Sequence, residues 1–330
     1  LWLSLNKDEA GVILTKTLEV QTDNAPAQYQ FKHLSFQEGL YAQHLLQTIL
    51  ALREHKGSSG VWEGWATNAA AADFLNNAYM NNVCRIASGK LGRLLATQRA
   101  EWNFADERCR LSWVGRSALW LIMDENTQLK VLNLSNNIVT AEDAPGVARM
   151  LSTCTGLQTL NLGATGLGKL DRPPLFVVAK ALSTNTTLTE LHMAGSALGP
   201  EGTATVVGAL KSCAGLKMLD LSDNQPTREQ AVAELMKTHT TLETLVVVES
   251  EAKHLDSRVR DAIGRALLGN PGSHLQYIEC DGFRLGPITT SLRWKAVTAS
   301  DAIMLAGALK VNTVLTSFEL GSGELNDDAR

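Results

Sequence analysis

The six-residue pattern Leu-x-x-Leu-x-Leu, or a close variant of it, recurs seven times between Leu129 and Leu320. The copies read LKVLNL, LQTLNL, LTELHM, LKMLDL, LETLVV, LQYIEC and LTSFEL, and they begin at Leu129, Leu157, Leu188, Leu216, Leu242, Leu275 and Leu315. Subtraction of these positions gives spacings of 28, 31, 28, 26, 33 and 40 residues. A unit of this length cannot bury its apolar face alone, so successive units must stack. The pattern therefore predicts an α/β solenoid with parallel strands on the concave face and helices on the convex face.

Composition restricts the remaining possibilities. The chain has 330 residues, 45% of them hydrophobic and 19% charged, which is typical of a globular protein large enough for two domains. Its net charge of −4 provides no general attraction to nucleic acid or to an anionic membrane. The five cysteines are scattered and odd in number, which favours a reducing compartment, so we expect a cytoplasmic protein. No apolar run is long enough to span a bilayer.

The repeats divide the chain into two expected domains. Residues 1–125 contain no copy of the pattern and are predicted to form a helical domain, in which Ser35 and Glu38 form a capping box. Trp62, Trp65, Trp102, Trp113 and Trp120 are expected to be core or interface residues joining these helices to the first repeat.

Residues 126–330 form the expected repeat domain of about seven repeats. Residues 286–294 are interpreted as an inserted loop ahead of a helix over residues 301–309. The chain begins with Leu, and its last residues, 324–330, resemble the start of another helix without a polar cap. We therefore expect a fragment of a longer protein, with a C-terminally incomplete array.

These repeats resemble the ribonuclease-inhibitor-like subclass of leucine-rich repeat proteins. The resemblance covers about 200 residues and implies the fold, whereas this scaffold serves inhibitors, GTPase activators and immune sensors alike. The asparagine that follows each strand in the family is present as Asn137 and Asn224. The equivalent positions hold Thr165, Ser196, Ser250 and Phe283, so these turns are expected to lose the side-chain bonds to the backbone. The fifth and sixth repeats are therefore expected to be irregular.

A second resemblance lies before the repeats. The segment YQFKHLSFQEGL, residues 29–40, is similar to the junction between the winged-helix and helical regions of NACHT-type signalling ATPases, except that Gly39 replaces an aromatic residue. In that family an ATPase module lies upstream and the repeats sense a ligand. The resemblance implies that this chain is the C-terminal, recognition part of an NLR-like sensor.

Motifs for catalysis are absent from the sequence. The nearest string to a phosphate-binding loop, Ser88-Gly89-Lys90-Leu91, lacks the required hydroxyl and first glycine and is interpreted as a helix junction. Neither a His-Glu-x-x-His, a Cys-x-x-Cys nor a Gly-x-Ser-x-Gly motif occurs. We therefore expect no enzymatic activity, no cofactor and no metal.

The expected function is binding of a protein partner on the concave face, where alternate strand residues point outward. The candidate partner-binding residues are Glu190, His192, Met218, Asp220, Val246, Tyr277, Glu279, Asp281 and Glu319. Five of these are acidic and none is Lys or Arg, which disfavours nucleic acid and favours a partner with basic and apolar groups. Charge reversal at Glu279 and Asp281 is expected to weaken the binding of such a partner.

Two alternatives use the same scaffold. A GTPase activator needs a catalytic side chain beside a strand end, for which Arg172 is the best available residue. A stoichiometric inhibitor, like ribonuclease inhibitor, needs no upstream switch. The sequence leaves the ligand, the oligomeric state and the pathway open.

Overall fold

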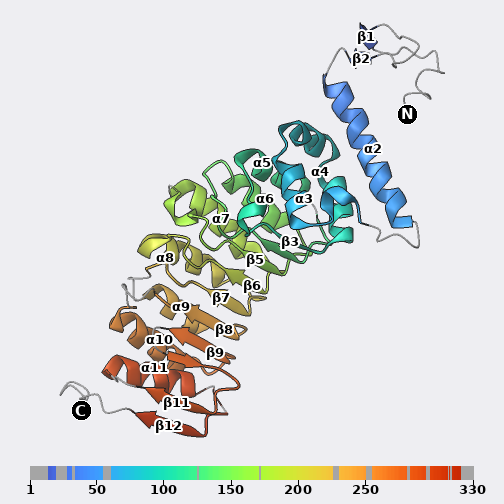
Figure 1. The fold of residues 1–330 in the computed structure, drawn as a ribbon. Helices are drawn as coiled ribbons and strands as arrows, with labels where there is room; N and C mark the ends of the chain where they lie inside the picture. Colours follow the sequence, from blue (N-terminus) through green and yellow to red (C-terminus); the bar gives the residue numbers. More distant parts are fainter. Residues whose placement is uncertain are drawn as a thin grey trace.

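The computed structural model describes residues 14–19, 28–31, 34–54, 61–124, 126–170, 172–225, 230–249, 255–280, 283–294, 298–310, 312 and 314–320. Strands follow one another along one side of the molecule and helices along the other (Figure 1). The expected α/β arrangement of a parallel sheet covered by helices is confirmed. Among the described helices, none combines the length and the hydropathy that crossing a bilayer requires.

The part before the repeats contains an antiparallel hairpin as well as helices. Strands β1 (Leu14–Glu19) and β2 (Gln28–Phe31) pair with each other and are followed by α2 (Leu34–Glu54), η1 (Glu63–Trp65), α3 (Asn68–Asn76) and α4 (Ala78–Gln98). The predicted capping box is wrong, because α2 already begins at Leu34 and the buried Glu38 carboxylate accepts a hydrogen bond from Asn82 Nδ2 at 2.9 Å. Glu38 therefore joins α2 to α4.

Helix α4 is kinked where the sequence resembled a phosphate-binding loop. Ser88 has a φ of 43°, and a Cβ atom at Gly92 would lie 1.7 Å from the Ile122 carbonyl oxygen at the end of α5 (Trp113–Ile122). The glycines thus let two backbones approach closely. The predicted helix junction is a kink within one helix.

Aromatic residues connect the helices to the sheet. The ring centroids of Trp65 and Trp102 lie 5.0 Å apart and those of Trp65 and Phe74 lie 6.0 Å apart, in edge-to-face arrangements that favour packing. Trp113 does not belong to this core, because 73% of its surface is exposed. The expectation for Trp113 is therefore wrong.

One sheet of eight strands spans most of the repeats. Its order is β10-β9-β8-β7-β6-β5-β4-β3, with bounds β3 (Glu101–Asn103), β4 (Val131–Asn133), β5 (Thr159–Asn161), β6 (Glu190–His192), β7 (Met218–Asp220), β8 (Thr244–Val247), β9 (Tyr277–Cys280) and β10 (Phe283–Leu285). Strands β3 to β9 are parallel, and β10 is antiparallel to β9.

The central residues of the parallel strands are in register and buried. They are Trp102, Leu132, Leu160, Leu191, Leu219, Leu245 and Ile278. The predicted stacking of the strand leucines is confirmed. Strand β3 lies upstream of the predicted boundary at residue 126, so the expectation of helices alone in residues 1–125 is corrected there; Trp102 stands where the pattern has leucine.

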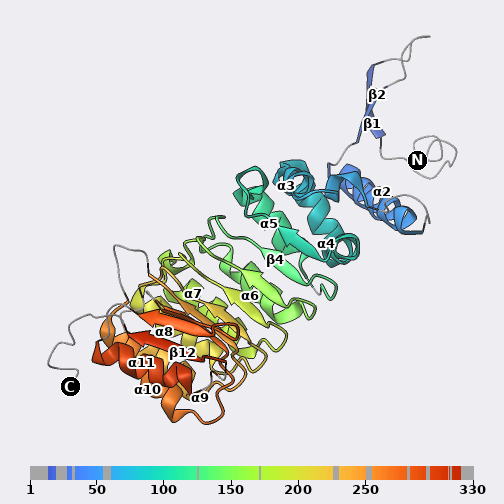
Figure 2. The same ribbon diagram turned by 60° about the horizontal axis from the view of Figure 1, so that its bottom comes forward.

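Helices follow the strands in turn and pack beside one another. After η2 (Glu107–Cys109) and α5 come α6 (Ala144–Thr153), η3 (Leu167–Lys169), α7 (Arg172–Thr184), α8 (Gly199–Leu210), α9 (Gln230–Thr238), α10 (Ser257–Gly269) and α11 (Ala299–Leu309). Figure 2 shows this helical layer continuing along the strands from α5 to α11.

The C-terminal part holds two strands, β10 and β11 (Ser291–Trp294), beyond those expected. Strands β11 and β12 (Ser317–Leu320) form a separate parallel pair with Leu292 opposite Phe318. The predicted inserted loop over residues 286–294 is therefore wrong at β11. The leucine pattern does not predict the unit that contains β11, because Thr289 and Trp294 occupy its outer leucine positions.

The turn after each strand is fastened by side chains. Asn137 Nδ2 donates to the carbonyl oxygens of Phe104 and Leu134, and Asn137 Oδ1 accepts from Leu111 N. Asn224 makes the same set of bonds three units later, with Met193, Leu221 and Leu198. Thr165 and Ser196 supply only a hydroxyl, and both donate to the Leu162 carbonyl. The expected loss of side-chain bonds to the backbone is thus only partial at Thr165 and Ser196.

A buried ion pair joins the first two helices of the array. Asp143, before α6, accepts from Arg116 Nε and from Trp120 Nε1 of α5, both at 2.8 Å, and from the backbone and hydroxyl of Thr140 at 2.9 Å. Burial by itself would raise the pKa of Asp143, but these hydrogen bonds outweigh it and lower the pKa below 3.8. The Asp143 carboxylate thus accepts hydrogen bonds both from α5 and from Thr140, before α6.

Replacing Asp143 with Ala should destabilise the fold by about 3–5 kcal/mol, because Arg116 would stay buried without its counter-charge. A depressed carboxyl pKa stabilises the folded state above the ordinary aspartate pKa, and this contribution disappears as the pH falls through the lower folded value. Urea unfolding at neutral and acidic pH measures both effects. Glu142→Ala, at an exposed neighbour, is the control and should change stability little; equal losses for both variants would contradict the assignment.

Candidate partner-binding surface

The outward residues of the parallel strands form two rows. We define the first row as Glu101, Val131, Thr159, Glu190, Met218, Thr244 and Tyr277, and the second row as Asn103, Asn133, Asn161, His192, Asp220, Val246 and Glu279. Each of these side chains is half-buried or exposed, while the strand residue between the two rows is buried. The alternation follows from the period of two along a strand.

The structure brings seven of the nine predicted residues together on β6 to β9. In the first row Glu190 is followed by Met218 and, beyond Thr244, by Tyr277. In the second row His192, Asp220, Val246 and Glu279 are consecutive. Glu319 lies on β12 in the separate two-stranded sheet, opposite Arg293. Asp281 lies outside the described residues.

Glu279 is paired with a cation that the sequence analysis did not place here. Arg284 on β10 stands opposite Glu279 in the antiparallel register, and its Nη2 atom donates to Glu279 Oε1 at 2.6 Å. The Tyr277 hydroxyl donates to the other carboxylate oxygen. The expectation of a face without Lys or Arg is therefore wrong at this end, and charge reversal at Glu279 would disrupt an internal pair.

The pKa values in this group follow from the contacts. Burial, reinforced by the hydrogen bond to Glu279, raises the pKa of Tyr277 to about 12. Burial would also raise the pKa of Glu279, but the hydrogen bonds from Arg284 and Tyr277 reverse the direction and lower it. At neutral pH the phenol is protonated and the carboxylate is charged.

The acidic residues of β6 and β7 also make contacts within the molecule. Glu190 Oε2 accepts from Thr159 Oγ1 at 3.1 Å and lies 4.0 Å from His192 Nε2. Asp220 Oδ1 accepts from Ser222 N at 3.0 Å, the turn-forming bond that Asn133 and Asn161 make in the same row. Glu190 is exposed and Asp220 is half-buried. These two carboxylates give the middle of the face its negative charge.

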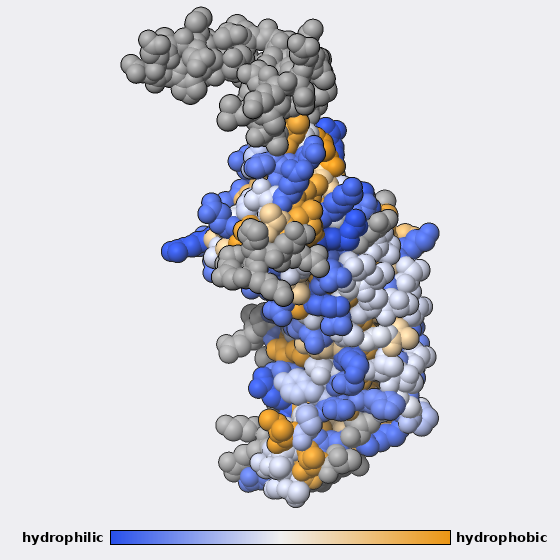
Figure 3. All heavy atoms as spheres, turned by 90° about the vertical axis from the view of Figure 1, so that its right-hand side faces the viewer, coloured by the Kyte–Doolittle hydropathy of each residue, from blue (hydrophilic) through white to orange (hydrophobic). Residues whose placement is uncertain are grey.

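The apolar residues of the rows form a small centre beside these acids. Met218, Val246 and Tyr277 are half-buried and lie on three neighbouring strands. Figure 3, turned toward the strand side, shows a largely hydrophilic surface in which hydrophobic residues occur in small groups. A polar surface around a few apolar or aromatic residues is typical of protein-binding sites.

A hairpin signal in the sequence could have found Arg284. The dipeptide Asp281-Gly282 stands between β9 and β10, and Asp-Gly between two apolar runs is a strong indication of a hairpin. The repeat pattern obscures this signal, because it predicts that the segment is the end of another repeat.

A metal site and a reactive thiol place different requirements on the described residues. No group of three His, Cys, Asp or Glu residues that could hold a metal occurs among the described residues. The five cysteines are free and buried, and burial raises the pKa of the Cys84 thiol to about 12 and that of Cys154 to about 11. Such thiols stay protonated and are poor nucleophiles.

Comparison with known proteins gives two similar regulatory proteins. No protein-family model matches the sequence. The chain is 27% identical over 178 residues to a protein phosphatase 1 regulatory subunit 37 homolog of Caenorhabditis elegans, covering 51% of this chain and 18% of that protein. The homolog of Caenorhabditis briggsae is 23% identical over 231 residues, covering 67% of this chain and 22% of that protein. The chain therefore spans about a fifth of the length of these relatives.

Replacing Arg284 with Ala should raise the pKa of Glu279, because burial would no longer be outweighed by the ion pair. The pKa can be followed by NMR titration of ¹³C-labelled glutamate side chains. Arg265→Ala is the control, because Arg265 pairs with Asp261 on α10 at 2.7 Å and not with Glu279. An unchanged Glu279 pKa in Arg284→Ala would show that the pair does not set the charge of this end.

Proposed function

We propose that the chain is a ribonuclease-inhibitor-like leucine-rich repeat solenoid that binds a protein partner through its two strand rows and catalyses no reaction. Its parallel strands, in-register leucines and successive helices support this fold. The five buried free cysteines support the cytoplasm as its location.

The observation that carries the binding proposal is the clustering of Glu190, Met218, Asp220 and Val246 on adjacent strands. Two carboxylates beside an apolar centre complement a partner that presents basic and apolar groups. The apolar residues contribute binding energy when a partner removes them from water, while the acids favour encounter and correct orientation. The same charges disfavour a nucleic-acid backbone.

A protein phosphatase catalytic subunit is the first partner to test. Both relatives are named as regulatory subunits of protein phosphatase 1, and their similarity to this chain extends over at least half of it. In this proposal the chain regulates the phosphatase by occupying a basic and apolar surface of the enzyme.

A sensor role is the second proposal, and it rests on residues 29–40 and on the helices that precede the repeats. There the strand rows would recognise a ligand for an NLR-like ATPase. A phosphate-binding loop encoded upstream of Leu1 would favour this role over phosphatase regulation.

GTPase activation is a third use of the same scaffold, with Arg172 at the start of α7 as its candidate catalytic residue. A GTP hydrolysis assay with small GTPases tests it. Acceleration that is lost in Arg172→Ala would replace the binding proposal with an enzymatic one.

Replacing Glu190 with Lys should weaken binding to the protein phosphatase 1 catalytic subunit roughly tenfold and make the remaining affinity less sensitive to salt. The expectation follows from introducing a positive charge where a basic partner surface would lie. Calorimetric titration at low and high salt measures both quantities.

Glu142→Lys is the matched control, because Glu142 is exposed beside α6 and outside both rows. It should bind the phosphatase like the natural chain. Equal weakening by both variants would place the contact outside the rows, and no binding by the natural chain would exclude this phosphatase as the partner.

A further inference from the structure

A ladder of backbone hydrogen bonds joins each unit to the next just before its strand. The carbonyl oxygen of one residue per unit accepts two successive amides of the following unit. Lys217 O, for example, accepts from Glu243 N and Thr244 N, both at 2.8 Å. The carbonyls that make this double bond in the eight-stranded sheet are those of Ala100, Lys130, Gln158, Thr189, Lys217 and Glu243.

The ladder stops at Gln276. The next carbonyl in the series is Gln276 O, to which no described residue donates a hydrogen bond, and the next amide, Thr290 N, has no acceptor among the described residues. The double bond resumes only at Thr290 O, which accepts from Thr316 N and Ser317 N. One junction therefore lacks the bond that all its described neighbours have.

Strand β10 explains the interruption. It occupies the edge of β9 in antiparallel register, with Leu285 opposite Ile278, so that extending the pairing would set residue 287 opposite residue 276. Residue 287 is proline, which has no amide hydrogen to donate. The chain turns away there through the Thr289 N to Gly286 O hydrogen bond. The hairpin thus blocks the next parallel strand without satisfying Gln276 O.

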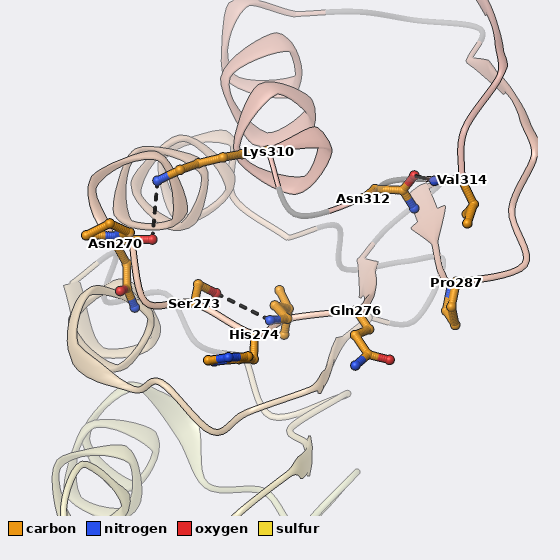
Figure 4. A pocket seen from close by; sticks show the side chains of 10 residues that line it. Asn270, Ser273, His274, Gln276, Pro287, Lys310, Asn312 and Val314 are labelled. Carbon is orange, nitrogen blue, oxygen red and sulfur yellow. Dashed lines mark hydrogen bonds between the residues drawn. The ribbon is translucent and has the colours of Figure 1, made fainter.

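A pocket of about 470 Å³ lies at this interruption (Figure 4). Its lining includes Gln276 and Pro287 from the sheet side, Ser273 and His274 from the loop before β9, and Val314 from the segment before β12. None of the lining residues is acidic. This volume is within the range of ligand-binding pockets.

Lys310, the cation that lines the pocket, is hydrogen-bonded to backbone carbonyls of the protein itself. Lys310 Nζ donates to the carbonyl oxygens of Leu268 at 2.8 Å and Asn270 at 3.2 Å at the end of α10, as Figure 4 shows for Asn270. The His274 Nδ1 atom contacts the Thr240 carbonyl oxygen at 2.6 Å. The pocket therefore offers a backbone acceptor to which no described residue donates, beside neutral side chains, rather than an anion site.

We propose that this pocket binds a short extended peptide segment of a partner protein, which donates two successive backbone amides to Gln276 O. Addition of an extended segment to an open sheet position is a common mode of peptide recognition, in which main-chain hydrogen bonds supply affinity. The side-chain amide of Gln276 and the hydroxyl of Ser273 line the pocket and would be the polar neighbours of such a segment. Pro287 and Val314 would supply apolar contact. The site is separate from the two strand rows.

A peptide copied from the array itself is the probe. Residues 215–222, GLKMLDLS, contain the amides of Lys217 and Met218 that bond Thr189 O in the ladder. Fluorescence anisotropy of the labelled peptide should show saturable binding to the whole chain. Methylating those two backbone nitrogens should weaken binding about tenfold, because it removes two hydrogen bonds and preserves the side chains.

Matched protein variants locate the site. Gln276→Trp should fill the pocket mouth and abolish peptide binding, whereas Lys217→Trp, at the equivalent position of an earlier unit, should preserve it. Glu190→Lys should also preserve it, which separates this site from the strand rows. Equal binding of both peptides, loss in both tryptophan variants, or no binding at about 1 mM peptide would overturn the proposal.

Discussion

Stacking of very short strands is the constraint on which this molecule depends. Most of its parallel strands have three or four residues, too few to be stable without neighbours. Each unit buries one central side chain against the next, and Leu160, Leu191 and Leu219 are completely buried. Full burial of such a side chain contributes roughly 1.5–3 kcal/mol. Because a unit gains this only from its neighbours, stability is shared along the array rather than held in one core.

Polar side chains repeat with the same period because they serve the same stacking. Asn126 and Asn185 each stand three residues before a repeat, donate to a carbonyl about one unit upstream, and accept from their own strand's first leucine. Cys154 and Cys213 take this position in other units and donate their thiols to the Met123 and Asn185 carbonyls. His239 takes it in a further unit, where burial lowers the pKa of the ring. Two of the five scattered cysteines thus have a periodic structural role.

The sequence alone predicts the strands and rows that depend on repeated leucine. It does not predict the strands in which another residue stands at a leucine position. The parallel order and the two rows followed from period and alternation, which need no knowledge of the third dimension. Strand β3 was missed because Trp102 replaces leucine, and β11 because Thr289 and Trp294 do. Arg284 was missed because its position opposite Glu279 depends on a hairpin that breaks the repeat. Spacing cannot show that a strand has reversed direction.

The same reversal accounts for both unusual features of the C-terminal half. By turning back along β9, β10 places Arg284 against Glu279 and neutralises one negative charge of the strand rows with an ion pair. It also ends near Pro287, which has no amide hydrogen and which an extension of the pairing would set opposite Gln276. A parallel strand there would have closed the ladder. One hairpin therefore ends the two strand rows and, at the same junction, leaves the Gln276 carbonyl as the acceptor that the proposed peptide would use.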